Sequence, residues 1–145
     1  MSKAIKYGSF NSIIGLLIGI FITTFSIGKG YWIFIVGAPI SAFLCGFYFW
    51  KLALKKWNED RIKRLIFTGF LTGTVSHYLC WILLGVSKSI CYHLTGNCIS
   101  SLGEPPIEIW QTFFFAIIMT GWSFLFFGWI TIPSAMVLGF LLDKK

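Results

Sequence analysis

Apolar residues gather along the chain into four long runs separated by short polar segments. The runs cover about residues 8–27, 31–52, 65–86 and 109–142. A bilayer core about 30 Å thick needs about 20 apolar residues per helix. We therefore predict an all-α, polytopic integral membrane protein of one domain, with four transmembrane helices arranged as two hairpins. Residues 53–64 would link the hairpins, and residues 87–108 would form a larger loop on the opposite side.

The last apolar run is longer than a single upright span requires. As one helix it would extend about 50 Å, because an α-helix rises about 1.5 Å per residue. One interpretation is a long helix kinked near Pro133, and the other is an intramembrane break at Gly128-Trp129. We favour the continuous helix, because a break would leave backbone groups without hydrogen-bond partners in lipid. Pro106 suits the first helical position, and Glu108 suits the first turn.

Overall composition supports the membrane class. Hydrophobic residues make up 57% of the chain and charged residues 12%, and the mean hydropathy is +0.80. Soluble domains carry about 25% charged residues, twice this fraction. The basic start and first apolar run resemble a signal peptide, but the run continues to Ile27 without a small-residue cleavage site. We predict that this segment is a retained first span.

Basic residues are divided very unevenly between the two sides that four spans would create. Ten lie at the termini or near the linker: Lys3, Lys6, Lys51, Lys55, Lys56, Arg61, Lys63, Arg64, Lys144 and Lys145. Only Lys29 and Lys88 lie on the other side. Basic residues beside spans favour the cytoplasm, so we predict cytoplasmic termini in a cell inner membrane. Anionic lipid then accounts for the net charge of +7 without nucleic acid.

Two cysteines, Cys91 and Cys98, frame the segment CYHLTGNC in the predicted outer loop. Gly96 and Asn97 can turn the chain between them, so we expect a disulfide in an oxidising compartment. Free thiols and a metal or redox centre that includes His93 are the alternatives. Zinc usually takes four ligands, and the chain lacks the CxxC pair of a thiol oxidoreductase.

No Asp, Glu, Lys or Arg lies deep within any of the four runs. Such residues in a bilayer mark ion pathways, proton relays or catalytic sites. The chain also lacks the GxSxG and HExxH motifs. We therefore predict a non-enzymatic protein with no catalytic residue, no cofactor and no metal.

Small residues recur at helical spacing in the predicted spans. Such faces allow helix backbones to approach closely, within one chain or between chains. The positions that we assign to helix packing or to an interface are Gly15 and Gly19 in the first span, Ala38, Ala42 and Gly46 in the second, and Gly69 and Gly73 in the third.

His77 lies in the middle of the third span, four residues after Gly73. Thr72 and Ser76 lie close to it in sequence, and together they form the most polar part of any span. One interpretation is a neutral histidine hydrogen-bonded to a neighbouring helix. The other is a polar intramembrane contact with a ligand or partner, or a pH-sensitive element.

These patterns favour a non-enzymatic inner-membrane protein that acts through protein–protein interaction within the bilayer. It would be an accessory subunit of a membrane complex or a protective, immunity-type protein, and its partners would be lipid and either a membrane protein or further copies of itself. The alternative is a small oligomeric transporter or channel for a neutral or lipid-like substrate, with Thr72, Thr74, Ser76 and His77 as its polar lining. A third hypothesis is a membrane thiol-redox protein that uses Cys91 and Cys98.

Overall fold

The computed structural model describes residues 2–27, 30–57, 59–99 and 103–143, and within these ranges the regular elements are all helices, with no strand. The elements in chain order are α1 (Lys3–Phe25), the 3-10 helix η1 (Tyr31–Ile33), α2 (Phe34–Lys56), α3 (Arg61–Thr95), α4 (Ile109–Ser123), the π-helix η2 (Phe124–Gly128) and α5 (Trp129–Leu142). Four helical stretches are long and apolar enough to cross a membrane. The prediction of an all-α chain with four candidate spans is therefore confirmed.

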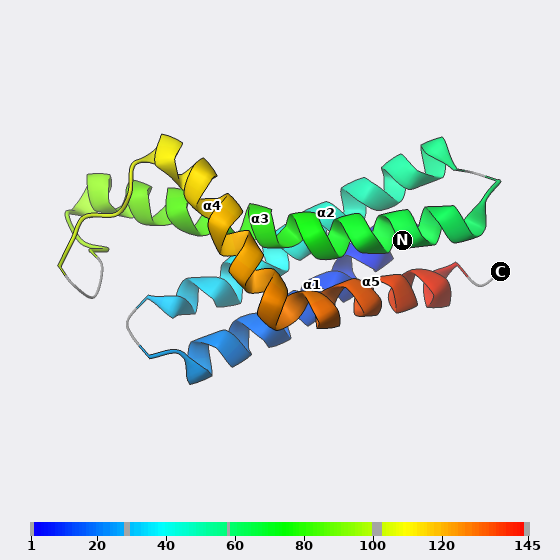
Figure 1. Ribbon diagram of the computed structural model, residues 1–145, viewed down its shortest axis with the longest axis horizontal. Coiled ribbons are helices and arrows are strands. Elements are labelled where there is room, and N and C mark those ends of the chain that lie inside the picture. The colour runs from blue at the N-terminus through cyan, green and yellow to red at the C-terminus, as the bar shows by residue number, and fades with distance from the viewer. Residues whose placement is uncertain (1, 28–29, 58, 100–102, 144–145) are drawn as a thin grey trace.

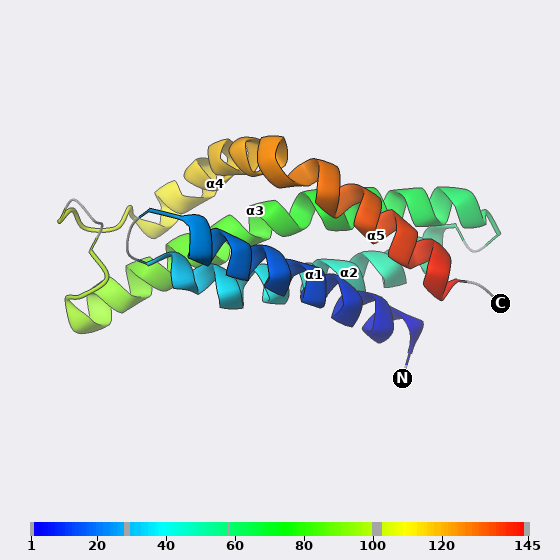
Figure 2. The same cartoon turned by 90° about the horizontal axis from the view of Figure 1, so that it is seen from below.

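The helices run back and forth along one long axis (Figure 1). The N-terminus, the C-terminus and the α2–α3 connection lie at one end, which we call the terminal end. The α1–α2 connection and the segment between α3 and α4 lie at the other end, the loop end, and the second view agrees (Figure 2). Lys29, Lys144 and Lys145, which entered the sequence predictions, lie outside the described residues.

Helix α3 is considerably longer than the span predicted for residues 65–86. It has 35 residues, because Asp60 caps its start and Gly96, with φ of 68°, ends it. Polar residues after position 86 end the apolar run, but they do not break a helix. The prediction of a loop is therefore wrong for residues 87–95. The linker predicted at 53–64 is likewise mostly helical, since α2 continues to Lys56 and α3 begins at Arg61.

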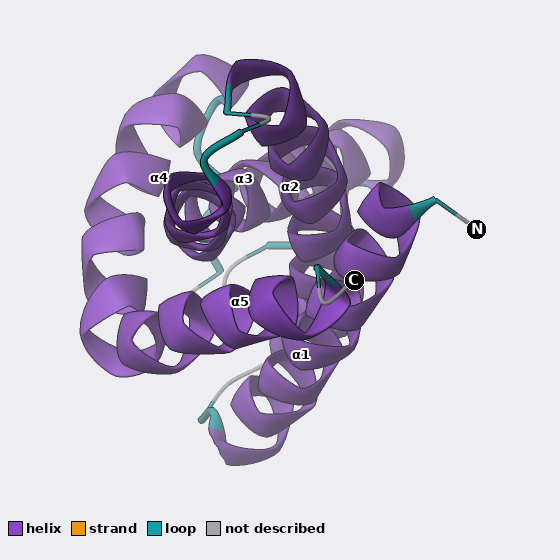
Figure 3. Cartoon of the chain, turned by 90° about the vertical axis from the view of Figure 1, so that its right-hand side faces the viewer, coloured by secondary structure: helices purple, strands orange, loops and turns teal. Residues whose placement is uncertain are grey.

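The last apolar run is one helical stretch whose irregularity lies at η2 rather than at Pro133. A proline ring clashes with the carbonyl four residues earlier, which here belongs to Trp129, directly after η2. The distortion therefore precedes the proline by one turn, and an end view shows α4 turning into α5 there (Figure 3). The stretch begins at Ile109 with Glu108 as its N-cap, in a capping box with Gln111, so Pro106 precedes the helix.

The small-residue faces are used for packing within the chain. A Cβ added at Gly15 would lie 2.7 Å from the Ala38 carbonyl oxygen, and one added at Gly69 would lie 2.8 Å from Met136 Cα. The same close approach occurs at three further positions: Gly19 against Phe34, Gly73 against Ile132, and Gly46 against Gly8. These contacts hold α1 to α2 and α3 to α5.

A buried cluster closes the bundle near the terminal end. It joins Tyr7 of α1, Trp50 of α2 and Leu65 of α3, which are each at most 1% exposed. The Tyr7 hydroxyl donates a 3.0 Å hydrogen bond to the Ala135 carbonyl oxygen, which adds α5 to the cluster. All four spanning stretches therefore meet at this level.

Candidate functional site

His77 of α3 is hydrogen-bonded on both sides of its ring by hydroxyls of the last helical stretch. Its Nδ1 lies 2.6 Å from Ser123 Oγ, and its Nε2 lies 3.0 Å from Thr131 Oγ1. Thr131 Oγ1 is also 3.4 Å from the carbonyl oxygens of Gly73 and Gly128. A neutral imidazole has one donor and one acceptor. Every group is satisfied if Nε2–H donates to Thr131, Thr131 donates to a carbonyl, and Ser123 donates to Nδ1.

The bend at η2 is what allows one ring to bind both hydroxyls. Ser123 and Thr131 are eight residues apart, and a straight helix would separate them by about 12 Å along its axis. That is farther than two hydroxyls on one imidazole can lie. The Phe124 ring packs beside the imidazole, at 5.4 Å between centroids. His77 therefore connects α4 to α5 across the bend.

A cavity of about 50 Å³ lies between α1, α2 and α3, beside this bend. Its polar lining comes from Asn11, Ser41, Thr72, Ser76, His77, Ser123 and Thr131. Thr72 is 2% exposed, and its hydroxyl has no hydrogen-bond partner within the described part of the chain. The cavity brings together the three polar residues singled out in the third span, Thr72, Ser76 and His77.

Helix α4 lies at the edge of the bundle and packs against α3 (Figure 3). Its buried residues, Thr112 and Ala116, face α3, where a Cβ added at Gly85 would lie 2.9 Å from Thr112 Oγ1. The opposite face, which we call the α4 outer face, comprises Phe114, Ile118 and Gly121 of α4 and Leu125 of η2. The three side chains on it are 64–70% exposed, and no described residue has an atom within 4 Å of a Cβ added at Gly121.

An ionic cluster lies at the terminal end, around Asp143. Arg64 Nη2 donates to Asp143 Oδ2 at 2.6 Å, and Arg61 Nε donates to the same oxygen at 3.2 Å. Lys3 Nζ lies 3.6 Å from Oδ1, and Arg64 also donates to the Trp57 carbonyl oxygen at 3.3 Å. Burial raises the pKa of Asp143. The Arg64 hydrogen bond and the three positive charges together lower it by more than burial raises it, so the net shift of the pKa is downward.

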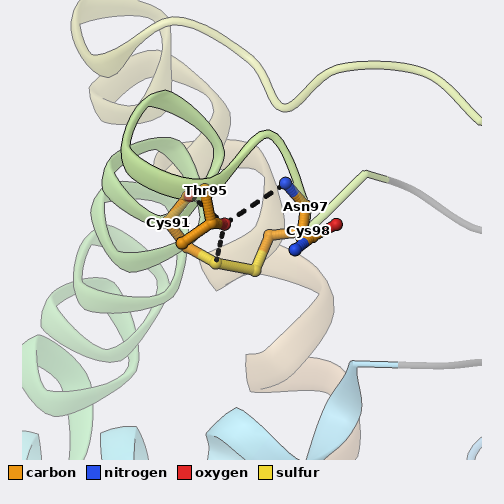
Figure 4. The surroundings of a disulfide bond; sticks show 4 residues. All are labelled: Cys91, Thr95, Asn97 and Cys98. Atoms are coloured by element: carbon orange, nitrogen blue, oxygen red, sulfur yellow. Dashed lines mark hydrogen bonds between the residues drawn. A yellow bond between two sulfur atoms is a disulfide. The ribbon is translucent and has the colours of Figure 1, made fainter.

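Cys91 and Cys98 form a disulfide, with their Cα atoms 6.0 Å apart (Figure 4). Cys91 lies in the last turns of α3 rather than in a free loop. Left-handed backbone at Gly96 and Cys98 returns the chain onto the helix end. The Thr95 hydroxyl donates to the Cys91 carbonyl and accepts from the Asn97 amide. The disulfide therefore fastens the C-terminus of α3 instead of restraining a long hairpin.

The other two cysteines, Cys45 and Cys80, are free thiols buried between the helices. Among the described residues, no three His, Cys, Asp or Glu side chains come close enough together to hold a metal ion. His93 is exposed at the end of α3, far along that helix from His77.

Sequence reasoning identified His77 but not its partners. Ser123 and Thr131 are isolated hydroxyl residues in an aromatic and aliphatic run. Isolated hydroxyl residues are common in membrane helices, so neither residue indicates a site by itself. Their spacing of eight residues indicates one face only if the helix between them bends. The one available signal was that both lie in the 34-residue stretch that is too long for an upright span.

No protein-family model, curated protein or solved structure matches this chain.

Proposed function

We propose that this chain is a non-enzymatic membrane protein that acts by protein–protein interaction within the bilayer, through the α4 outer face. In this proposal it is an accessory subunit of a membrane complex or a protective, immunity-type protein. The basic terminal end faces the cytoplasm of a cell with an inner membrane, because basic residues beside spans favour that side. Lipid and a membrane-protein partner are its ligands.

The observation that carries the proposal is the exposed Gly121 in the centre of the α4 outer face. A glycine costs about 1 kcal/mol relative to alanine in a helix interior, and here no neighbour among the described residues makes use of its small size. Small residues on membrane helices are favoured where a second helix approaches closely. Phe114, Ile118 and Leu125 surround the glycine and supply apolar contact area for such a helix.

The location of α4 adds a second argument. The other small-residue faces are occupied by contacts within the chain, with Gly15 and Gly19 against α2 and Gly69 and Gly73 against α5. Helix α4 packs against α3 on one side only. Its outer face is therefore left exposed within the described part of the chain, where Phe114, Ile118 and Leu125 are 64–70% exposed.

One observation favours the alternative of an oligomeric transporter or channel for a small neutral solute. The cavity beside His77 provides polar groups near the middle of α3, as a solute pathway through the bundle requires. Four helices enclose little space, so this function needs several copies of the chain. Lipid-like substrates fit less well, because the cavity of about 50 Å³ is small.

The experiment that separates these functions is photo-crosslinking in the native membrane. A benzophenone amino acid replaces Phe114 on the α4 outer face or, as the control, Leu17 on α1, which is similarly exposed at 62%. A product with another polypeptide from position 114 alone supports the interaction function. A product at twice the 16.5 kDa mass of the chain supports self-assembly. Lipid adducts alone at both positions would overturn the proposal.

A matched pair of substitutions then tests the glycine. Gly121→Leu should abolish the crosslink from position 114, because a large side chain keeps a partner helix at a distance. Leu17→Phe, on the exposed side of α1, should leave the crosslink unchanged. Native mass spectrometry of the chain in mild detergent identifies the crosslinked partner by mass.

A further inference from the structure

The cavity beside His77 contains a polar group that the fold leaves unsatisfied. Thr72 projects from α3, is 2% exposed and lines the cavity, and its hydroxyl has no partner among the described residues. Threonines in helices commonly donate to the carbonyl four residues earlier, as Thr68 does to Arg64 at 2.7 Å. Thr72 does not, so its hydroxyl is available to a molecule in the cavity.

The surroundings of Thr72 offer further hydrogen-bonding capacity. Ser41 of α2 donates to the Ala38 carbonyl at 2.9 Å, and its oxygen can still accept. Asn11 of α1 donates to the Tyr7 carbonyl at 2.8 Å. Both are at most 5% exposed and line the same cavity. Three helices thus direct polar groups into one space at the middle of the bundle.

The volume of the cavity decides the class of ligand. A space of about 50 Å³ is well below the about 150 Å³ of an apolar cavity that binds benzene. An acyl chain or ring compound is therefore too large. One water needs about 10–15 Å³ measured in this way, together with two to four polar partners, and the cavity meets both conditions.

We propose that this cavity is an internal water site. It holds a cluster of about three to five waters, which hydrogen-bond to Thr72 and to the other polar groups of the lining. The waters supply the partner that Thr72 lacks in a region where lipid can supply none. They also place solvent against His77, although the histidine lies at the depth of the bilayer core. This inference is independent of the α4 outer face.

The test is water-edited NMR of the full chain in nanodiscs made with deuterated lipid. Magnetisation transfer from water is measured at the ring protons of His77 and at the methyl group of Thr72. We expect transfer to both in the wild-type chain. Absence of transfer at both positions would show a dry cavity and overturn the proposal. In a second sample made with protonated lipid, transfer from the acyl chains in place of water would also overturn it.

Variants at two threonines of α3 then locate the waters. Thr72→Val keeps the shape but removes the hydroxyl, so water transfer at His77 should fall and the thermal midpoint should not rise. If the cavity is dry, the same change removes an unsatisfied group and the midpoint rises, which contradicts the proposal. Thr72→Ser should restore the transfer. Thr68→Val removes a hydroxyl that is satisfied within α3, and it should leave transfer at His77 unchanged.

Discussion

Arg64 donates a 2.6 Å hydrogen bond to Asp143 across 79 residues of sequence, and this contact joins the start of α3 to the end of α5. Both side chains are at most 10% exposed. Asp143 also binds Arg61 and Lys3, so a single acid gathers basic groups from the first residues of α1 and the first turn of α3. The terminal end of the molecule is organised around this carboxylate.

Replacing Asp143 should destabilise the fold strongly. Asp143→Asn removes the negative charge but keeps the shape, and it leaves Arg64 buried beside other cations. Breaking a buried ion pair costs about 3–5 kcal/mol, and we expect the lower end of that range at this peripheral site. The measurement is the free energy of unfolding in detergent. Lys63→Met, which breaks the exposed pair with Asp60, is the control and should change stability little.

Stability should also depend on pH through the same carboxylate. The pKa of Asp143 is lowered in the folded chain, whereas an unfolded aspartate has a pKa of about 3.9. A lowered pKa stabilises the fold fully above the unfolded value, and that contribution is lost as the pH falls through the folded value. The thermal midpoint should therefore stay about constant between about pH 5 and pH 7. It should decline below about pH 4.

Asp143→Asn should make that acid decline shallower. Asp60, whose pKa is lowered mainly by its hydrogen bond with Lys63, has a side chain that is 41% exposed and should contribute little. Asp60→Asn therefore serves as the comparison in the same pH series. If the thermal midpoint of Asp143→Asn falls below about pH 4 as steeply as that of the wild type, other groups govern the pH dependence.

Removing the disulfide should loosen the end of α3 and leave the bundle intact. A ring this small contributes at most about 2–3 kcal/mol in the chain-entropy model. Cys91→Ser with Cys98→Ser should speed hydrogen exchange at Tyr92–Thr95, whereas amides near Gly69 stay protected. Mass shifts on alkylation of the unfolded, unreduced wild type should count two thiols, from Cys45 and Cys80. Four alkylated cysteines would contradict the disulfide.

The contact between His77 and Ser123 should appear as a coupling energy. In a double-mutant cycle with His77→Leu and Ser123→Ala, we expect about 0.6–1.7 kcal/mol, the range of polar contacts between membrane helices. Thr120→Val is the matched control, because its hydroxyl bonds to Ala116 within α4. Its effect should add to that of His77→Leu without coupling. If the effects of His77→Leu and Ser123→Ala on the free energy of unfolding simply add, the contact between the two side chains does not stabilise the bend.

Alanine substitutions should distinguish the packed glycines from the exposed one. Gly69→Ala places a methyl group against the backbone of Met136 and should lower the thermal midpoint by several degrees or prevent folding. Gly121→Ala adds a methyl group that meets no atom of the described residues, and it should raise stability because alanine favours the helix by about 1 kcal/mol. Equal loss in both variants would contradict the assigned packing.

The sequence predicted the spans well because hydropathy directly reflects the bilayer. It misplaced the end of α3, since Ser87 and Lys88 end an apolar run without ending a helix. Only Gly96, with its left-handed backbone, does so. Periodicity also indicated the tight glycine contacts but not their partners, because apolar sequence carries no information on which helix lies opposite Gly69.

The sequence likewise revealed only one residue of the polar site, because it does not show which helices face each other. His77 stands out as a titratable residue in a span, whereas Ser123 and Thr131 become its partners only through the bend at η2. That bend depends on how Pro133 and Trp129 are accommodated in three dimensions. The ionic cluster was hidden as well, because the number of charges at each end of a span gives no information on which side chains pair with Asp143.

The uneven fastening of the bundle has a mechanical consequence. Salt bridges and the buried Tyr7 cluster hold the terminal end together, whereas α4 packs against α3 on one side and is hydrogen-bonded to His77 through Ser123 at its C-terminus. We therefore expect α4 to separate from the bundle on heating before the terminal end unfolds, with the π-helix η2 as the hinge of this motion.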